Sequence, residues 1–138
     1  NLHSDALRRN REMNDPYYIA DNLCYLAAVS LKLGALDDTE AYIRESLELA
    51  AKINALVVLF QIFDCWAEWF NSQRQFERAA ELVGFIVHHP AVSAAVAKQA
   101  RALYQDLETK LPSDQLLALI ARGKDTSIEM IIHQLRQR

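Results

Sequence analysis

The chain has 138 residues and a formal net charge of −3, and 51% of its residues are hydrophobic. This length fits one domain or a short run of stacked repeats, and three Gly and three Pro leave little turn chemistry for β-hairpins. The basic residues are scattered, and we interpret the densest cluster, Arg8, Arg9 and Arg11, as a solvated helix face. We therefore expect no direct binding of nucleic acid by this segment.

Apolar residues recur at helical spacing along nearly the whole chain. Asp15 and Pro16 are typical of an N-cap and a first helical position, and Gly34 is typical of a helix C-terminus. The spacing of Thr126 and Glu129 predicts a capping box at the last helix. We expect an all-α fold of about eight helices and no strand, with helices near residues 4–13, 16–33, 37–53, 55–72, 75–88, 93–110, 113–123 and 127–135.

Two helix pairs can be aligned by setting each residue n against residue n + 40, which places Gly34 in register with Arg74. In this register large residues match large ones and small residues match small ones. The matched pairs are Leu23 with Phe63, Leu26 with Trp66, Ala27 with Ala67, Leu36 with Phe76, and Thr39 with Ala79. Small residues let paired helices approach, and large ones fill the layer between them.

This pattern resembles the tetratricopeptide repeat. The residues that carry the resemblance are Leu23, Leu26, Ala27, Ser30, Thr39, Ile43 and Ser46 in the first copy, and Phe63, Trp66, Ala67, Phe70, Ala79, Val83 and Ile86 in the second. The chain departs from the family in its period of 40 against the usual 34, in Arg74 where the first copy has Gly34, and in the bulky Ile86. The resemblance implies a right-handed superhelix of antiparallel helix pairs.

We divide the single domain, residues 1–138, according to that pattern. Residues 1–14 are expected to be the trailing helix of a preceding repeat, 15–54 and 55–92 two repeats, and 93–138 the C-terminal capping helices. The run from Phe76 to Gly84 and the tail from Ala121 to Glu129 are also similar to the C-terminal repeat arrays of bacterial STAND-type ATPases and MalT/LuxR-like transcriptional activators. In those regulators the array is a sensor or docking arm beside a nucleotide switch.

Cys24 and Cys65 lie in apolar helical patterns without a Cys-x-x-Cys motif. We interpret them as reduced core or near-core residues, and a disulfide is compatible but not implied. Trp66 is a core residue by register, whereas Trp69 suits a core position and a partner contact equally. With no long apolar run and no secretory signal, we expect a cytoplasmic protein that does not enter a membrane. The chain begins at Asn1 without Met, which suggests a fragment of a larger protein.

The sequence offers little for catalysis. Its three glycines are isolated, so no phosphate-binding loop is indicated, and we expect no cofactor. His88 and His89 are adjacent near a helix end, where contact with free carbonyls is more typical than metal binding, so we expect no metal site. Asp64 and Glu68 are one helical turn apart and could suggest acid–base chemistry, but no nucleophile accompanies them. We expect no enzymatic activity.

In tetratricopeptide arrays the first helix of each pair lines a concave groove. Carried over by register, the partner-binding residues would be Asp21, Cys24, Ala28 and Leu31 in the first copy, and Gln61, Asp64, Glu68 and Asn71 in the second. The carboxylates Asp64 and Glu68 would favour a basic or amide-rich peptide, although both are equally compatible with a solvated face.

These residues leave three hypotheses about function. The first is a protein-interaction or signal-sensing module of a bacterial regulator, whose partner is a protein, a peptide or another domain of its own chain. The second is a structural scaffold that self-associates, for instance as a homodimer, through exposed stacking faces. The third is a small-molecule effector domain of a transcriptional activator, for which no particular residue argues.

Overall fold

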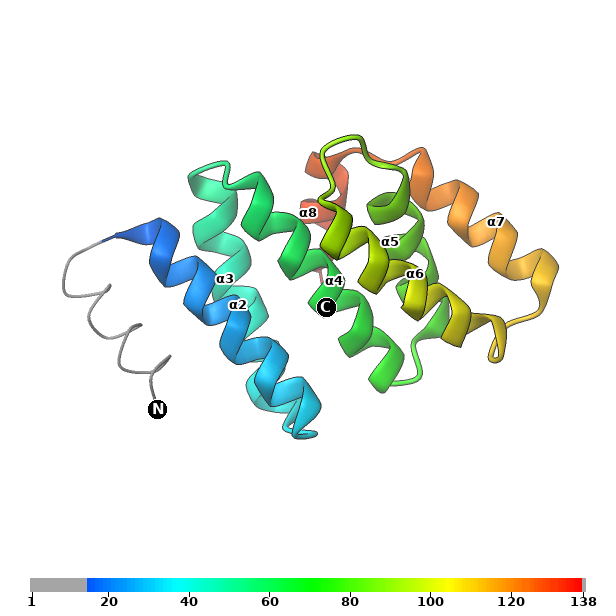
Figure 1. Cartoon of the computed structure of the whole chain (residues 1–138), viewed down its shortest axis with the longest axis horizontal. Helices are drawn as coiled ribbons and strands as arrows, with labels where there is room; N and C mark the ends of the chain where they lie inside the picture. The colour runs from blue at the N-terminus through cyan, green and yellow to red at the C-terminus, as the bar shows by residue number, and fades with distance from the viewer. Residues whose placement is uncertain (1–14, 138) are drawn as a thin grey trace. The chain divides into compact units, whose positions relative to one another are not determined.

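A computed structural model describes residues 15–137, and over this range the chain forms seven helices and no strand (Figure 1). The expected all-α class is therefore confirmed for the described residues. The helices are α2 (Pro16–Lys32), α3 (Leu36–Lys52), α4 (Leu56–Ser72), α5 (Phe76–His88), α6 (Ala94–Glu108), α7 (Ser113–Lys124) and α8 (Ile128–Arg136). The further helix expected near residues 4–13 lies outside the described residues.

Helix α2 begins as its sequence predicts. The Asp15 carboxylate accepts a hydrogen bond from the backbone N–H of Tyr17 at 3.1 Å, which satisfies a donor that has no partner inside the helix. Pro16 occupies the first helical position, where its missing N–H costs nothing.

Helices α2, α3 and α4 end in the same kind of turn. Gly34, Asn54 and Arg74 have positive φ angles of 78°, 53° and 62°, respectively. After each of them the next backbone N–H donates to a carbonyl five residues earlier, as Ala35 does to Ser30 at 2.9 Å and Gln75 to Phe70 at 2.9 Å. This is the Schellman arrangement, which closes the last helical turn and reverses the chain. The turn at Arg74 therefore has the same backbone form as the turn at Gly34.

Helices α2 to α5 recur at a constant interval. Helices α2, α3, α4 and α5 begin at Pro16, Leu36, Leu56 and Phe76, so the spacing between successive starts is the same each time. Two such intervals make one helix pair and equal the period that aligns Gly34 with Arg74 in the sequence. The spacing ends after His88, because α6 begins at Ala94.

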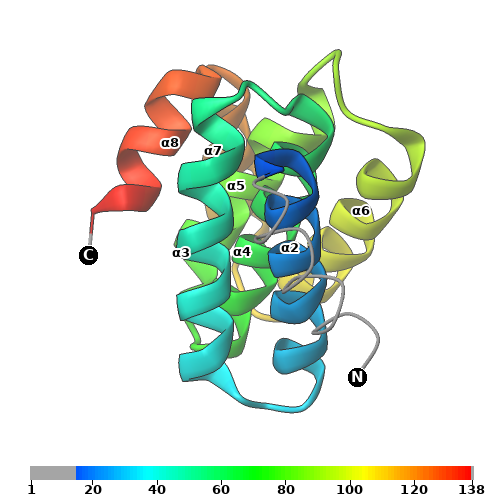
Figure 2. The ribbon, with the colours of Figure 1, turned by 90° about the vertical axis from the view of Figure 1, so that its left-hand side faces the viewer.

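The chain divides into two compact units, residues 1–65 and 66–138, with the boundary inside α4. In the first unit α2 and α3 pack side by side in opposite directions (Figure 2). Ala20 and Ser46 are fully buried where these helices meet, and the Ser46 hydroxyl donates a 2.7 Å hydrogen bond to the Ala20 carbonyl. Small side chains permit this close approach, and the hydrogen bond satisfies the buried hydroxyl.

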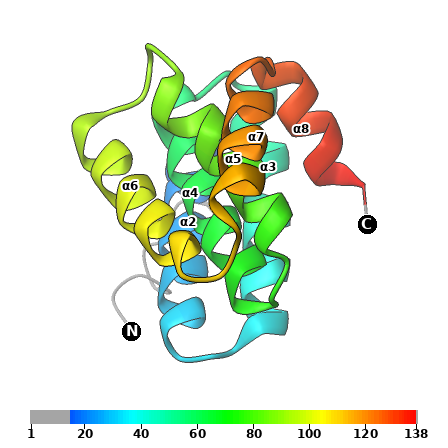
Figure 3. The ribbon, with the colours of Figure 1, turned by 90° about the vertical axis from the view of Figure 1, so that its right-hand side faces the viewer.

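In the second unit α5 is flanked by α6 and α7 (Figure 3). Its packing against α7 is the more extensive of the two, and α6 and α7 contact each other only marginally. Two buried glycines make the α5–α7 approach possible. A Cβ atom at Gly84 would lie 2.8 Å from Cα of Ile120, and one at Gly123 would overlap the Glu81 carbonyl. These helices therefore meet backbone to backbone.

The capping box expected for α8 is wrong by one residue. Ser127, not Thr126, is the N-cap, and its hydroxyl accepts from the Met130 N–H at 3.2 Å. The Thr126 hydroxyl instead donates to the Arg122 carbonyl at 3.0 Å, near the end of α7. The link between α7 and α8 is very short, so neighbouring residues serve two different helix ends. Thr126 donates to a carbonyl at the end of α7, and Ser127 accepts from an N–H at the start of α8.

Candidate partner-binding helix faces

The eight residues predicted to bind a partner lie on α2 and α4, the first helices of the two pairs. Asp21, Cys24, Ala28 and Leu31 follow one another at three- and four-residue steps, so they share one face of α2. The residues one period later, Gln61, Asp64, Glu68 and Asn71, share the corresponding face of α4.

The structure gives these side chains different degrees of exposure. Asp21 is exposed, and Cys24 and Asp64 are buried, with 6% and 4% of their surface accessible. The remaining five, Ala28, Leu31, Gln61, Glu68 and Asn71, are half-buried. Six of the eight residues thus retain surface that a partner could contact. Binding by this set stays a prediction.

Cys24 lies within the electrostatic reach of two carboxylates. Burial, together with the negative charges of Asp21 and Asp64, raises the pKa of the Cys24 thiol from 9.0 to about 12. The residue is therefore a neutral thiol at physiological pH, in keeping with its interpretation as a reduced core cysteine. Cys65 is also buried and free of any disulfide.

Burial changes how the acidic pair on α4 can act. We expected Asp64 and Glu68 to face a partner together, but Asp64 is 4% exposed whereas Glu68 is half-buried. Of these carboxylates, Glu68 and the exposed Asp21 therefore keep surface that a partner could contact. A four-residue step fixes which residues share a face, but it does not say how deeply each one is covered.

Asn71 belongs to a polar cluster that the sequence did not predict. Its Nδ2 donates to the Asp106 carboxylate at 2.9 Å, and its Oδ1 accepts from Lys110 Nζ at 3.2 Å. Lys110 also pairs with Asp106 at 2.7 Å, and its ammonium lies 5.1 Å from the centre of the Phe76 ring. Hydrogen bonds from Lys110 and Asn71 lower the pKa of the Asp106 carboxyl. This cluster joins the end of α4 to α6 by hydrogen bonds. Its residues are far apart in the sequence, so no local pattern predicts that they meet.

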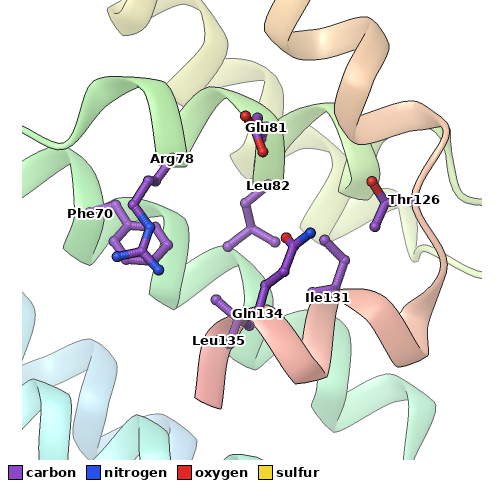
Figure 4. A pocket seen from close by; sticks show the side chains of 8 residues that line it. All are labelled: Phe70, Arg78, Glu81, Leu82, Thr126, Ile131, Gln134 and Leu135. Atoms are coloured by element: carbon purple, nitrogen blue, oxygen red, sulfur yellow. The ribbon is translucent and has the colours of Figure 1, made fainter. Parts of the chain in front are cut away.

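A small hollow lies in the second unit where the end of α4, α5 and α8 meet (Figure 4). The Arg78 guanidinium stands over the Phe70 ring at 4.4 Å and borders this hollow together with Leu82, Ile131 and Leu135. Its volume is about 40 Å³. That is room for one or a few water molecules and far less than a drug-sized ligand needs.

The two adjacent histidines make backbone contacts near the end of α5. His88 Nδ1 lies 2.9 Å from the Gly84 carbonyl oxygen, and His89 Nδ1 accepts from the Ala91 N–H at 3.0 Å. Among residues 15–137, no three His, Cys, Asp or Glu side chains are grouped as metal ligands would be. None of the helices in that range combines the length and the apolar character that crossing a membrane requires.

Comparison with protein-family models, curated proteins and solved structures finds no match to this chain.

Proposed function

We propose that this chain is a tetratricopeptide-like interaction module that binds a protein or peptide through the faces of α2 and α4 defined above. The observation that carries the proposal is the constant interval between helix starts from α2 to α5, together with the three identical turns between these helices. Regularly repeated helix pairs stack in one direction and build extended binding surfaces in place of enclosed pockets. A right-handed superhelix is part of this proposal.

Charge favours a basic partner. Residues 15–65 contain three Lys or Arg against eight Asp or Glu, a net charge of −5, whereas residues 66–137 contain eight of each. The excess negative charge thus belongs to the unit that holds α2 and the first half of α4. Such a field speeds the association of a positively charged segment and selects against an acidic one.

The wider role follows from the resemblance to bacterial regulators. We propose that the module serves as a sensing or docking arm in such a protein, with a peptide or another domain of the same protein as its partner and with no catalytic step of its own. A nucleotide-switch domain encoded beside this segment would support that role, and sequencing of the flanking reading frame tests it directly.

Peptide titration tests the binding face itself. Fluorescence anisotropy of the full chain with a labelled Lys- and Ser-rich peptide should show binding, and an Asp- and Ser-rich peptide should show none. The double variant Asp21→Lys and Glu68→Lys should lower the affinity for the basic peptide by about tenfold or more at low salt. Asp64 is left unchanged because a buried lysine would unfold the helix pair.

A matched control separates the face from net charge. Glu108→Lys with Glu129→Lys reverses two exposed carboxylates on α6 and α8 and changes the net charge by the same amount. This variant should retain most of the affinity. Equal losses in both double variants would show that overall charge, and not the α2–α4 face, attracts the peptide.

A further inference from the structure

The hollow where the end of α4, α5 and α8 meet is bordered by a positive charge that no carboxylate balances. The Arg78 guanidinium lies 4.4 Å from the centre of the Phe70 ring, and its Nη1 donates to the neutral Gln75 side chain at 3.3 Å. Among residues 15–137, no carboxylate oxygen lies within ion-pair distance of this guanidinium. A guanidinium has several N–H donors in a fixed fork, so Arg78 can donate to a further acceptor in the hollow.

Glu81 also lines the hollow, but its charge is offset by Arg122. Glu81 Oε1 and Arg122 Nη1 are 2.8 Å apart, and Glu81 is half-buried. The charged groups at the hollow are thus Arg78 and Arg122 against Glu81, a net charge of +1. A site with this balance attracts an anion and disfavours a cation.

Apart from its charged border, the hollow is lined mainly by apolar side chains. Phe70 and Leu82 are each 3% exposed, and Ile131 and Leu135 are each 4% exposed. Gln134 is exposed and reaches from α8 toward α5, so its amide adds polar hydrogen-bonding capacity at the rim (Figure 4). A ligand that suits this lining has an anionic group next to an apolar one.

We propose that this hollow binds a carboxylate that carries a short apolar substituent. The carboxylate accepts from the Arg78 guanidinium, whose fork matches two carboxylate oxygens, and the substituent covers Leu82 and Ile131. A volume of about 40 Å³ limits the bound group to something as small as propionate or the last residue of a peptide. Stacking on Phe70 holds the guanidinium in place beforehand, which lowers the entropic cost of binding.

NMR titration of the full chain with sodium propionate tests the site. The Arg78 Nε–H and the methyl groups of Leu82 and Ile131 should shift together and saturate, with a Kd of about 1–10 mM for so small a ligand. Propionamide, a neutral molecule of similar shape, and ethylammonium chloride should give no saturable shift. Ionic strength is held constant, because screening alone changes exposed resonances.

Three single variants separate the site from net charge. Arg78→Gln should lower the affinity for propionate by about tenfold or more, because the charged hydrogen bonds are lost. Arg101→Gln removes the same charge from an exposed position on α6 and should leave the Kd within about twofold. Gln134→Glu adds a carboxylate of the chain itself to the hollow and should abolish binding. All three residues are exposed, so the variants should keep the fold.

Two peptides distinguish the sources of the carboxylate. A Gly- and Ser-rich peptide that ends in alanine is titrated with a free C-terminus and again as its C-terminal amide. Tighter binding of the free-acid peptide than of propionate would assign the hollow to peptide C-termini, and binding of propionate alone would assign it to free short-chain acids. The absence of a saturable shift with both carboxylates would overturn the proposal, as would equal shifts with propionamide or unchanged affinity in Arg78→Gln.

Discussion

At the scale of single residues, the three turns show how different side chains meet one backbone requirement. Gly34 adopts positive φ without steric cost, Asn54 tolerates it, and Arg74 must place its Cβ close to its own carbonyl. Gly34 could be predicted from its residue type. Arg74 could be placed in the same conformation only through the repeat register, because arginine itself gives no signal for it.

Replacing Arg74 by glycine should stabilise the protein. Removal of the Cβ strain should outweigh the greater entropy of the unfolded chain, for a net gain of about 0.5–1 kcal/mol in the free energy of unfolding. Urea unfolding of Arg74→Gly measures the gain, and the reverse change Gly34→Arg should cost a similar amount. A loss of stability in Arg74→Gly would mean that the arginine side chain makes a contribution larger than the backbone strain.

The buried thiol of Cys24 predicts a loss of stability at alkaline pH. The unfolded thiol ionises near its ordinary pKa of 9.0, whereas the folded thiol keeps its proton to about pH 12. Between these values the folded state binds more protons, so the stabilisation is complete below pH 9 and declines as the pH rises toward 12. The limiting slope from this group is about 1.4 kcal/mol for each pH unit.

Urea unfolding between about pH 8 and 10.5 checks this prediction when it is repeated on Cys24→Ala. Lysines and tyrosines titrate in both proteins, so their effects cancel in the comparison. The unmodified chain should lose stability more steeply than the variant. Parallel curves would show that the thiol ionises in the folded state at its ordinary pKa.

At the scale of helices, sequence periodicity predicted where helices form better than which of them touch. The expected bounds agree with the observed ones to within two residues, and Asp15, Pro16 and Gly34 act at the helix ends as expected. The contact of α5 with α7 was missed. Gly84 and Gly123 are each isolated in the sequence, and nothing local indicates that the helices carrying them meet at these two positions.

The contact between α5 and α7 decides whether replacing Gly84 by alanine stabilises or destabilises the protein. Alanine is a better helix former than glycine by about 1 kcal/mol, so propensity alone predicts that Gly84→Ala stabilises α5. Its Cβ would, however, overlap the backbone of Ile120, which cannot rotate away as a side chain can. We expect Gly84→Ala to lower the free energy of unfolding by about 2 kcal/mol or more.

Gly34→Ala is the matched control for this experiment. A Cβ at Gly34 meets no atom within 4 Å, so this change should cost about 1 kcal/mol, through backbone strain alone. Urea unfolding of both variants distinguishes the two causes. A stabilised Gly84→Ala protein would show that α5 and α7 are farther apart than the glycines imply.

At the scale of the whole chain, the burial of charge was the least predictable property. The sequence placed Asp64 on the same face as Glu68, and the structure then buries Asp64 and leaves Glu68 half-exposed. Depth depends on every element packed around a helix, including elements far away in the sequence. The regular part, from α2 to α5, follows from a local period, whereas α6 to α8 depart from that interval and are arranged through contacts that no period describes.

The uneven distribution of charge over the chain leads to the last prediction. Ala41 is exposed on α3 and lies one helical turn from Asp37, Asp38 and Glu45, within residues 15–65, which carry a net charge of −5. The free energy of unfolding of Ala41→Lys should exceed that of Ala41→Glu by about 1 kcal/mol at low salt. Lysine relieves the repulsion among these carboxylates, whereas glutamate adds to it.

Ala118 gives the comparison within residues 66–137, where positive and negative side chains are equal in number. It is exposed on α7 with Asp114 one turn before it and Arg122 one turn after it, so Ala118→Lys and Ala118→Glu should differ by only a few tenths of a kcal/mol. Thermal unfolding of the four variants in low salt and in about 0.5 M salt separates charge from helix propensity, since salt should close the gap at residue 41 and leave the propensity term unchanged. A gap at residue 41 that persists in high salt would contradict the electrostatic explanation, and with it the view that the acidic unit is the part of the chain that attracts a basic partner.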